Sequence, residues 1–444
     1  MLERTGTIVF ILMVAALGFI AGALVVVSES PTHGFFRDAY SAATALKARK
    51  ASLTDRYGTD QWYDVRRPER GVTLHDAARA QPGYTLYTSG DSARASLIDL
   101  EGKVVHEWTT PFSEIWAPDA AVAKPQPDEF VFMRKVHLYP NGDLLAIYEA
   151  AGDTPYGYGM AKLDRDGKVL WRYLQPAHHD FDLTPDGRIV LLTHEFVFEG
   201  PEDASFLSRP YLDDFLVVLS PDGEELAKVS LVEAVMRSPY RKHLHAAPYF
   251  ALADPLHTNS VVYVDAAKAA NLSIAEEGQA IVSFRDLGVL AVVDLDQQTL
   301  TWASRGAWVG QHDPKVLDNG ELLLFDNLGN VEAGNASRIL QFDPVTMEIK
   351  WRYAGDAREA PFDSPLRSEV ARLPNGNTLI TESDGGRIFE VTPSGERVWE
   401  YINPIRSGQN GGRIPVVTSG QRIAPEALDT DFREFIITRQ ENAS

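Results

Sequence analysis

The sequence predicts an all-β protein, a six-bladed β-propeller preceded by one transmembrane helix. Three observations predict it: a strand–turn–strand unit that recurs along the chain, Asn-Gly or Asp-Gly at many of its turns, and one long apolar run near the N-terminus. Four antiparallel strands bury their faces only against neighbouring units, so six consecutive units indicate a closed ring. We therefore expect a membrane anchor at residues 1–30, a juxtamembrane helix and linker at 31–82, and the propeller at 83–444.

The N-terminal apolar run is expected to be an uncleaved, single-pass membrane anchor. Residues 7–27 carry no charged side chain, and a helix of roughly 20 residues crosses the hydrocarbon core of a bilayer. The run ends in Ser28-Glu29-Ser30 without a clear cleavage site. Bulky domains translocate largely regardless of loop charge, which favours a propeller in the periplasm or outside the cell, tethered to the inner (cell) membrane. A short helix around Arg37–Lys50 and then irregular chain are expected next.

Each repeating unit is predicted to contain two hairpins. The first has a tight Asn-Gly or Asp-Gly turn between apolar strands, and the second has another Asp/Gly-rich turn and usually a closing tryptophan. These tryptophans are expected to pack between blades. The late segment Glu434–Arg439 is expected to be the strand that completes the first blade. The six units lie near residues 83–110, 129–176, 177–231, 254–306, 311–356 and 368–404.

Composition excludes several function classes. Lys and Arg number 42 against 62 Asp and Glu, a formal net charge of −20, which disfavours binding to nucleic acid phosphates. The chain has no cysteine, which excludes disulfides, iron–sulfur clusters, Cys-ligated zinc and a thiol nucleophile. We assign no metal and no cofactor from the sequence, and the oligomeric state is left open.

The inner strand of each blade lines the central channel, so residues at matching offsets from its turn glycine should ring one site. The first set lies eight positions before the turn glycines Gly142, Gly187, Gly320 and Gly376, with one member from the opening strand of the fourth unit: Arg134, His179, His312 and Ser368, and His257. The second set lies seven positions after the turn glycine: Glu149, His194, Arg285 and Asn327.

This combination of imidazoles and guanidinium groups suits chemistry on an oxyanion. Arginine binds tetrahedral oxygens, and histidine can serve as nucleophile, acid or base near neutral pH. Sulfuryl or phosphoryl transfer follows as a class, and metal-assisted hydrolysis stays open. A single histidine is often only structural, but core packing does not require three in one register. His178 should point to the opposite face from His179.

Four segments resemble the bacterial arylsulfate sulfotransferases, or arylsulfotransferases: DPLHTNSVVYV, AIVSFRDLGVLAVVDLD, QHDPKVLDNGELLLFDN and RLPNGNTLITESDGGRIFEVTPSGERVWEY. The resemblance covers roughly residues 80–404. It implies a propeller that moves a sulfuryl group from an aryl sulfate donor to a phenolic or other hydroxyl acceptor through a sulfohistidine, without a nucleotide donor.

The resemblance also implies roles for individual residues. His312 corresponds to the nucleophile, His257 and His179 to two supporting histidines, and Arg285 to the arginine of the sulfate clamp. From these positions we expect His257 and Arg285 to hold the sulfuryl oxygens and His179 to protonate the leaving phenolate. The register adds three substrate-binding candidates, and loop aromatics are candidates for holding the donor ring: Arg134, His194 and Asn327, then Tyr148, Tyr158, Phe284 and Trp308.

Two other functions fit parts of the sequence. The blade ending Gly167-Lys168-Val169-Leu170-Trp171 suggests a quinoprotein-like dehydrogenase, which six blades and the absence of cysteine disfavour. A membrane-tethered scaffold propeller without catalysis is preferred if His257, Arg285 and His312 do not converge. The chain also departs from the family pattern after Arg285, where Asp286-Leu287-Gly288 follows and the segment up to His312 is short.

Overall fold

The computed structural model describes residues 2–27, 50, 55–153, 156–250, 253–355 and 362–443. The chain forms two compact units, Met1–Asp55 and Arg56–Ser444. The first contains helix α1 (Leu2–Val27). Among the described residues, no helix is long and apolar enough to cross a membrane, so the transmembrane anchor predicted at residues 7–27 is not supported. Apart from Lys50, the helix predicted around Arg37–Lys50 lies outside the described residues.

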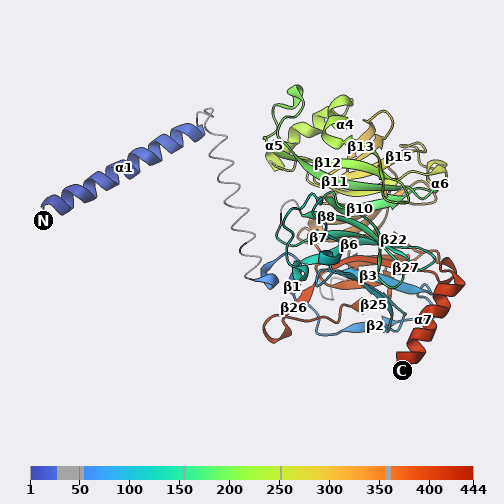
Figure 1. Ribbon diagram of the computed structural model, residues 1–444. Helices are drawn as coiled ribbons and strands as arrows, with labels where there is room; N and C mark the ends of the chain where they lie inside the picture. The colour runs from blue at the N-terminus through green and yellow to red at the C-terminus, as the bar shows by residue number, and fades with distance from the viewer. Residues whose placement is uncertain are drawn as a thin grey trace. The chain divides into compact units, whose positions relative to one another are not determined.

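The second unit is the predicted six-bladed β-propeller (Figure 1). Blades are numbered along the chain, and in each the innermost strand is given first. Blade 1 contains β27 (Val417–Ile423), β3 (Tyr84–Ser89), β4 (Arg94–Ile98) and β5 (Val104–Thr109). Blade 2 contains β6 (Val131–Leu138), β7 (Leu144–Ala150), β8 (Gly157–Leu163) and β9 (Val169–Tyr173). Blade 3 contains β10 (Ala177–Leu183), β11 (Ile189–Val197), β12 (Tyr211–Leu219) and β13 (Glu225–Ser230).

The remaining blades follow the same antiparallel order. Blade 4 contains β14 (Thr258–Tyr263), β15 (Gln279–Phe284), β16 (Val289–Asp294) and β17 (Thr299–Arg305). Blade 5 contains β18 (His312–Val316), β19 (Leu322–Asn330), β20 (Ala336–Phe342) and β21 (Ile349–Tyr353). Blade 6 contains β22 (Glu369–Arg372), β23 (Thr378–Glu382), β24 (Arg387–Val391), β25 (Arg397–Ile402) and a fifth strand, β2 (Gly71–His75).

Short elements connect the blades. The helices are α3 (Phe112–Ile115), α4 (Leu231–Arg237), α5 (Ala247–Phe250), α6 (Ala266–Ala269) and α7 (Thr430–Ala443). Single 3-10 turns occupy Arg56–Gly58, Asp128–Phe130, Glu202–Ala204, Arg241–Ala246, Val331–Ala333, Gln409–Gly411 and Pro425–Ala427. A small sheet pairs β1 (Trp62–Asp64) with β26 (Arg413–Pro415). Both β1 and β2 fall in the stretch that the sequence assigned to the linker.

The ring is closed by β27, which pairs with β3 so that the two ends of the propeller share blade 1. The prediction that Glu434–Arg439 completes this blade is wrong, because that segment lies inside α7. Phe432 and Ile436 are one helical turn apart and both are buried, which is the spacing of a helix that packs one face on the propeller. The true closing strand contains few apolar residues, so it carries no clear strand signal.

The closing tryptophans pack between blades, as predicted. The indole nitrogen of Trp108 donates to the carbonyl of Gly142 in the next blade at 3.1 Å, and that of Trp351 donates to Pro393 at 2.8 Å. Trp399 of blade 6 donates to Leu100 of blade 1 at 2.9 Å, across the ring closure. Each contact ties the last strand of one blade to a turn of the following blade, and the turn position Gly142 has the positive φ of 89° that the hairpin requires.

Candidate active site

The residues predicted from the strand register meet at one cavity of about 330 Å³, at the end of the channel where the inner strands begin. The cavity is bounded by strands and loops of blades 2 to 6, together with residues just before β1. His257, Arg285 and His312, whose convergence separates an enzyme from a scaffold, all line it. The other lining residues that the sequence singled out are Arg134, Glu149 and His179.

A bulge at the start of three inner strands turns the histidines into this cavity. The pairing register shifts after His178 in β10, after Thr258 in β14 and after His312 in β18. The backbone takes a left-handed conformation inside two of these bulges, with φ of 55° at His179 and 51° at Asp313, and just before the third, with φ of 46° at His257, the residue that precedes β14. Side chains other than glycine rarely adopt it, and such strain is concentrated at functional sites. In each of the three blades, a bulge therefore lies at or next to the histidine whose side chain lines the cavity.

His312 is held in one tautomer. Asn327 donates from Nδ2 to the carbonyls of Ser364 at 2.7 Å and Arg367 at 2.9 Å, which turns Asn327 Oδ1 towards His312 Nδ1 at 2.8 Å. The Gly310 carbonyl also lies 2.9 Å from Nδ1. Both partners accept, so Nδ1 carries the proton and Nε2 carries the lone pair. Burial, followed by the nearby Arg285 charge, lowers the pKa of His312 well below its ordinary value, so the ring is neutral.

The Asn327→Leu variant is expected to lower kcat about 10- to 100-fold with little change in KM, because the second tautomer of His312 is no longer disfavoured by the amide. The Gly310 carbonyl remains, which limits the loss. Steady-state rates, corrected for the folded fraction by circular dichroism, measure the effect. An unchanged kcat in folded protein would contradict the positioning role of Asn327.

His257 forms a charged relay with two neighbours. Its Nδ1 lies 2.6 Å from Asp254 Oδ2, and its Nε2 lies 3.0 Å from Arg285 Nη1. Burial alone lowers the pKa of His257, but the charge and hydrogen bond of Asp254 outweigh burial and Arg285, so the pKa is raised. Arg285 is itself held by Asp286, with Nε 2.8 Å from Oδ1. Arginine only donates, so the 3.0 Å contact is the hydrogen bond of neutral His257, and charged His257 turns its Nε2–H from Arg285 towards the cavity. The raised pKa means that His257 takes up this second proton at pH values where His312 stays neutral.

The Asp254→Asn variant is expected to shift the alkaline limb of the kcat/KM pH profile down by about one unit or more, because the carboxylate that raises the pKa of His257 is removed. Because the pKa of His257 is raised in the folded protein, its pair with Asp254 also makes the stability of the fold depend on pH. The charged His257–Asp254 pair stabilises the fold fully below the ordinary His pKa of about 6.5, and this contribution is lost as pH rises through the raised pKa. Unfolding at pH 5.5 and pH 9 should show the larger loss in the variant at pH 5.5.

His179 is the third imidazole of the cavity, and it is neutral. Burial, followed by the neighbouring imidazoles, lowers the pKa of His179 well below its ordinary value. Its Nδ1 lies 2.8 Å from His178 Nδ1 and 3.3 Å from the Tyr156 hydroxyl, and its backbone N–H donates to Glu149 Oε1 at 2.7 Å. His178 does not line the cavity, but its ring lies 5.1 Å from that of His179 rather than on the opposite face, because the strand bulges at this point. The electrostatics favour His257 over His179 as a proton donor.

Two predicted substrate-binding residues lie behind the cavity wall. Neither His194 nor Asn327 is among the described residues that line the cavity. Asn327 orients His312, and His194 stacks on His178 with ring centroids 4.4 Å apart. Arg134 does line the cavity, where its Nη1 donates to the Thr418 carbonyl at 2.7 Å.

The aromatic candidates lie in the core, and other residues take their place. Tyr148, Tyr158, Phe284 and Trp308 are buried in hydrophobic clusters between strands. The aromatic side chains at the cavity are Phe132 and Tyr156, and a further guanidinium comes from Arg367, paired with Asp60 at 2.6 Å. Sequence reasoning missed these residues because Tyr156 lies in the loop between the two hairpins of its unit and Asp60 precedes the first unit, so neither has a register position. Arg367 had one signal, since it directly precedes the register residue Ser368.

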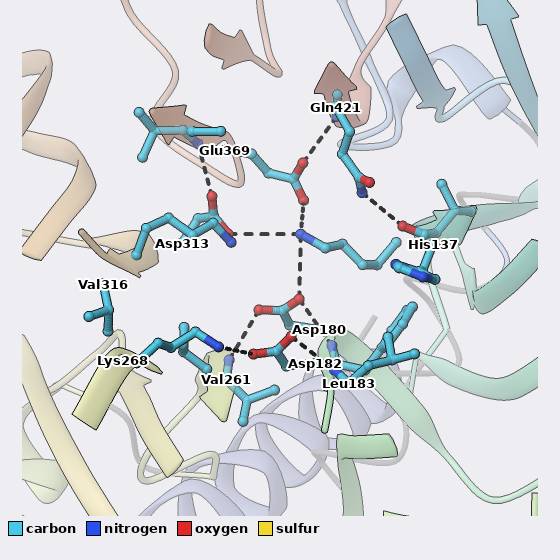
Figure 2. Close-up of a pocket in the computed structure, with 18 residues that line it drawn as sticks. His137, Asp180, Asp182, Leu183, Val261, Lys268, Asp313, Val316, Glu369 and Gln421 are labelled. Carbon is cyan, nitrogen blue, oxygen red and sulfur yellow. Dashed lines mark hydrogen bonds and ion pairs between the residues drawn. The ribbon is translucent and has the colours of Figure 1, made fainter. Parts of the chain in front are cut away.

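Below the cavity, farther along the inner strands, a buried ion-pair cluster around Lys135 lines a second pocket of about 280 Å³ (Figure 2). Lys135 Nζ lies 2.6 Å from Glu369 Oε1, 3.5 Å from Asp180 Oδ1 and 3.8 Å from Asp313 Oδ1. Burial lowers the pKa of Lys135, but the three carboxylates raise it by more than burial lowers it. The pKa therefore lies above its ordinary value, and the lysine is charged. Lys315 adds a second cation, 2.6 Å from Asp313.

This Lys135 cluster fixes the backbone next to two of the cavity histidines. Asp180 directly follows His179, and Asp313 directly follows His312. The outer oxygens of the two aspartates accept from the backbone N–H of the neighbouring blades, at Val261 (3.1 Å) and Val370 (2.9 Å). The cluster therefore joins blades 2 to 6 at the level of the bulges.

Comparison with known proteins gives one family. No protein with a curated description matches the chain at a significant level. Similar solved structures include a protein of unknown function from Bacteroides caccae (14% identity, TM-score 0.47, 76% of this chain and 99% of that one). Another is virginiamycin B lyase from Staphylococcus aureus (11% identity, TM-score 0.39, 78% and 89%). Structural likeness at this level carries no argument about function.

The family match covers most of the propeller. The arylsulfotransferase (ASST) family matches residues 135–404, which include His179, His257, Arg285 and His312. This range is more than half of the chain, and it agrees with the resemblance seen in the sequence. The chain belongs to the arylsulfotransferase family.

Proposed function

We propose that this protein transfers a sulfuryl group from an aryl sulfate to a phenolic or other hydroxyl acceptor, without a nucleotide donor and through a covalent sulfohistidine at His312. The observation that carries the proposal is the fixed tautomer of His312, whose neutral ring offers an Nε2 lone pair in a cavity lined by arginines. A lone pair is what a nucleophile needs, and guanidinium groups stabilise the charge that develops on sulfuryl oxygens.

In the first half-reaction, Nε2 of His312 attacks sulfur and the bond between sulfur and the aryl oxygen breaks. The electron pair of that bond leaves with the phenolate, which takes the Nε2 proton of charged His257. The positive charge that develops on the His312 ring is stabilised by Asn327 Oδ1 and the Gly310 carbonyl, which accept from Nδ1–H. Neutral His257 then accepts a hydrogen bond from Arg285 Nη1 at the 3.0 Å contact.

The second half-reaction reverses these steps with the acceptor. Its hydroxyl gives the proton to His257 Nε2, its oxygen attacks sulfur, and the bond between sulfur and His312 breaks with its electron pair returning to Nε2. Because donor and acceptor both present an oxygen to the same imidazole pair, one cavity serves both, and the kinetics are ping-pong. Arg285 and Arg134 bind the sulfuryl oxygens, since both lie close enough to lower the pKa of His312.

Tyr156 is the aromatic contact we propose for the donor ring. Its ring lies edge-on to His179 at 5.4 Å and tilted to His257 at 6.4 Å, between two imidazoles of the cavity. Aryl rings pair favourably in such edge and offset arrangements. An aromatic leaving group that packs against Tyr156 would also place its phenolate oxygen near His257, the proposed proton donor.

Intact-mass spectrometry tests the proposal. The full chain, mixed with excess 4-nitrophenyl sulfate and quenched in denaturant, is expected to gain about 80 Da, one sulfuryl group on a nucleophilic side chain. A phenol added before the quench should remove the added mass and yield the aryl sulfate of that phenol. Release of nitrophenol without a covalent adduct would indicate direct transfer or hydrolysis. If the protein neither releases nitrophenol nor gains mass, a non-catalytic scaffold propeller is favoured instead.

A further inference from the structure

A second cluster of potential ligands lies behind the cavity wall in blade 3. His178 of β10, His194 of β11 and Asp214 of β12 are neighbours across the sheet, and their side chains are 0%, 0% and 2% exposed. One nitrogen from each ring and one Asp214 oxygen lie within 4.8 Å of one another. Tyr156 and His179 separate the cluster from the cavity, with the Tyr156 ring 4.7 Å from that of His194.

The polar atoms of this cluster are incompletely satisfied by hydrogen bonds. Among the described residues, neither ring nitrogen of His194 has a hydrogen-bond partner, and the same holds for Nε2 of His178. His178 Nε2 lies 3.4 Å from Asp214 Oδ1, whereas Asp214 Oδ2 accepts from the Thr258 N–H at 2.6 Å. Buried polar groups in folded proteins nearly always have a partner, because an unpaired one costs about 1–3 kcal/mol. A fully buried imidazole with two unpaired nitrogens therefore calls for a ligand.

We propose that His178, His194 and Asp214 bind one divalent transition-metal ion, such as Zn²⁺. Two imidazole nitrogens and a carboxylate oxygen are a donor set that such ions prefer, and Ca²⁺ or Mg²⁺ would require more oxygens. The charges fit, since the buried carboxylate of Asp214 lies beside two imidazole rings and supplies negative charge to a divalent cation. Metal–ligand distances near 2 Å place ligand atoms roughly 3.3 Å apart. His178 Nε2 and Asp214 Oδ1 are already 3.4 Å apart, and the wider pairs, which lie within 4.8 Å, need to close by at most about 1.5 Å.

The ion occupies a supporting position rather than the reacting centre. His178 Nδ1 remains 2.8 Å from His179 Nδ1, so coordination of the metal at His178 Nε2 fixes the ring that orients His179. The three ligands come from three adjacent strands, so the ion joins β10, β11 and β12 at the bulge. The inference does not depend on the reaction that the cavity performs.

Metal analysis and thermal unfolding of the full chain test the proposal. The purified protein is analysed by inductively coupled plasma mass spectrometry, stripped with EDTA, and titrated with ZnCl₂. We expect about one ion per chain, and a melting temperature that rises by about 3 °C when zinc is restored at about 100 times its Kd. His194→Gln should lose both the ion and the response, whereas His137→Gln, a half-buried histidine of β6 outside the cluster, should keep both.

A second variant covers the case in which His194→Gln does not fold. Asp214→Asn still accepts from the Thr258 N–H but loses its charge, and it should bind zinc at least about tenfold more weakly. Co²⁺ added to the stripped wild type should give visible absorption bands that His194→Gln or Asp214→Asn lacks. A wild-type protein with no metal and no thermal response to zinc would overturn the proposal, as would equal zinc binding by wild type and both variants.

Discussion

Replacing His312 by alanine is expected to reduce sulfuryl transfer about 10,000-fold or more and to abolish the covalent adduct. The cavity contains two other imidazoles, but among the described contacts neither has the pair of carbonyl and amide oxygens on Nδ1 that fixes the tautomer of His312. Charged His257 has no free lone pair while it is paired with Asp254, and His179 Nδ1 faces His178. Nitrophenol release from 4-nitrophenyl sulfate measures the rate, and intact mass measures the adduct.

His137→Ala is the control for the loss of a histidine. His137 lies on the inner strand β6 but lines the channel below the cavity rather than the cavity itself. It should retain the wild-type adduct and at least most of the rate. A His312→Ala protein that still gains the sulfuryl mass would move the nucleophile to another side chain and remove the basis of the proposed mechanism.

Replacing Lys135 by methionine is expected to lower the free energy of unfolding by about 3–5 kcal/mol. The substitution leaves Glu369, Asp180 and Asp313 buried around an apolar side chain, with Lys315 as the nearest cation and its Nζ on Asp313. Removing one member of a buried ion cluster leaves charges without compensation, which costs far more than losing an exposed pair. Urea unfolding followed by fluorescence at pH 7 measures the difference.

Lys268→Met is the matched control. Lys268 lines the same pocket (Figure 2). Its Nζ pairs with Asp265 at 2.8 Å and its side chain is 27% exposed, against 11% for Lys135, so its loss should cost about 0–1 kcal/mol. If the two variants are equally stable, the Lys135 cluster does not hold the blades together. Because Asp180 and Asp313 adjoin the bulges, folded Lys135→Met should also show a lower kcat, whereas Lys268→Met should not.

The fold could be predicted wherever hairpin turns repeat. Gly142, Gly187, Gly320 and Gly376 each stand at a positive φ in the tight turn after an inner strand, as Asn-Gly and Asp-Gly sequences require. The prediction failed at ring closure, where β27 has no such turn and is identified only by its pairing with β3. An alternating apolar segment in α7 resembled a strand, because six residues do not separate a period of two from one of 3.6.

The site was predictable to the extent that the strand register is regular. Counting from the turn glycine places Arg134, His179 and His312 at one cavity because each lies at or next to a bulge near the start of its inner strand. The residues of the second predicted set lie in two different places: Glu149 and Arg285 line the cavity, whereas His194 and Asn327 lie behind its wall. Whether a residue of this set lines the cavity or lies behind it depends on the conformation of the loop after the second strand. The spacing of residues in the sequence does not predict that conformation. The proton states of His257 and His312 required the three-dimensional neighbours.

Ring closure by β27 has a consequence for how the protein is made. The inner edge of β3 waits about 300 residues of synthesis, on the order of half a minute on the ribosome, before its partner strand emerges. Throughout that time it is an open sheet edge, of the kind that recruits foreign strands. Arg134 lacks the Thr418 carbonyl, and Glu369 lacks the Ser419 hydroxyl and Gly420 N–H that it binds at 3.0 Å. The side chains of Arg134 and Glu369 therefore gain these partners only when β27 docks, which makes closure of the ring the last step in building the cavity wall.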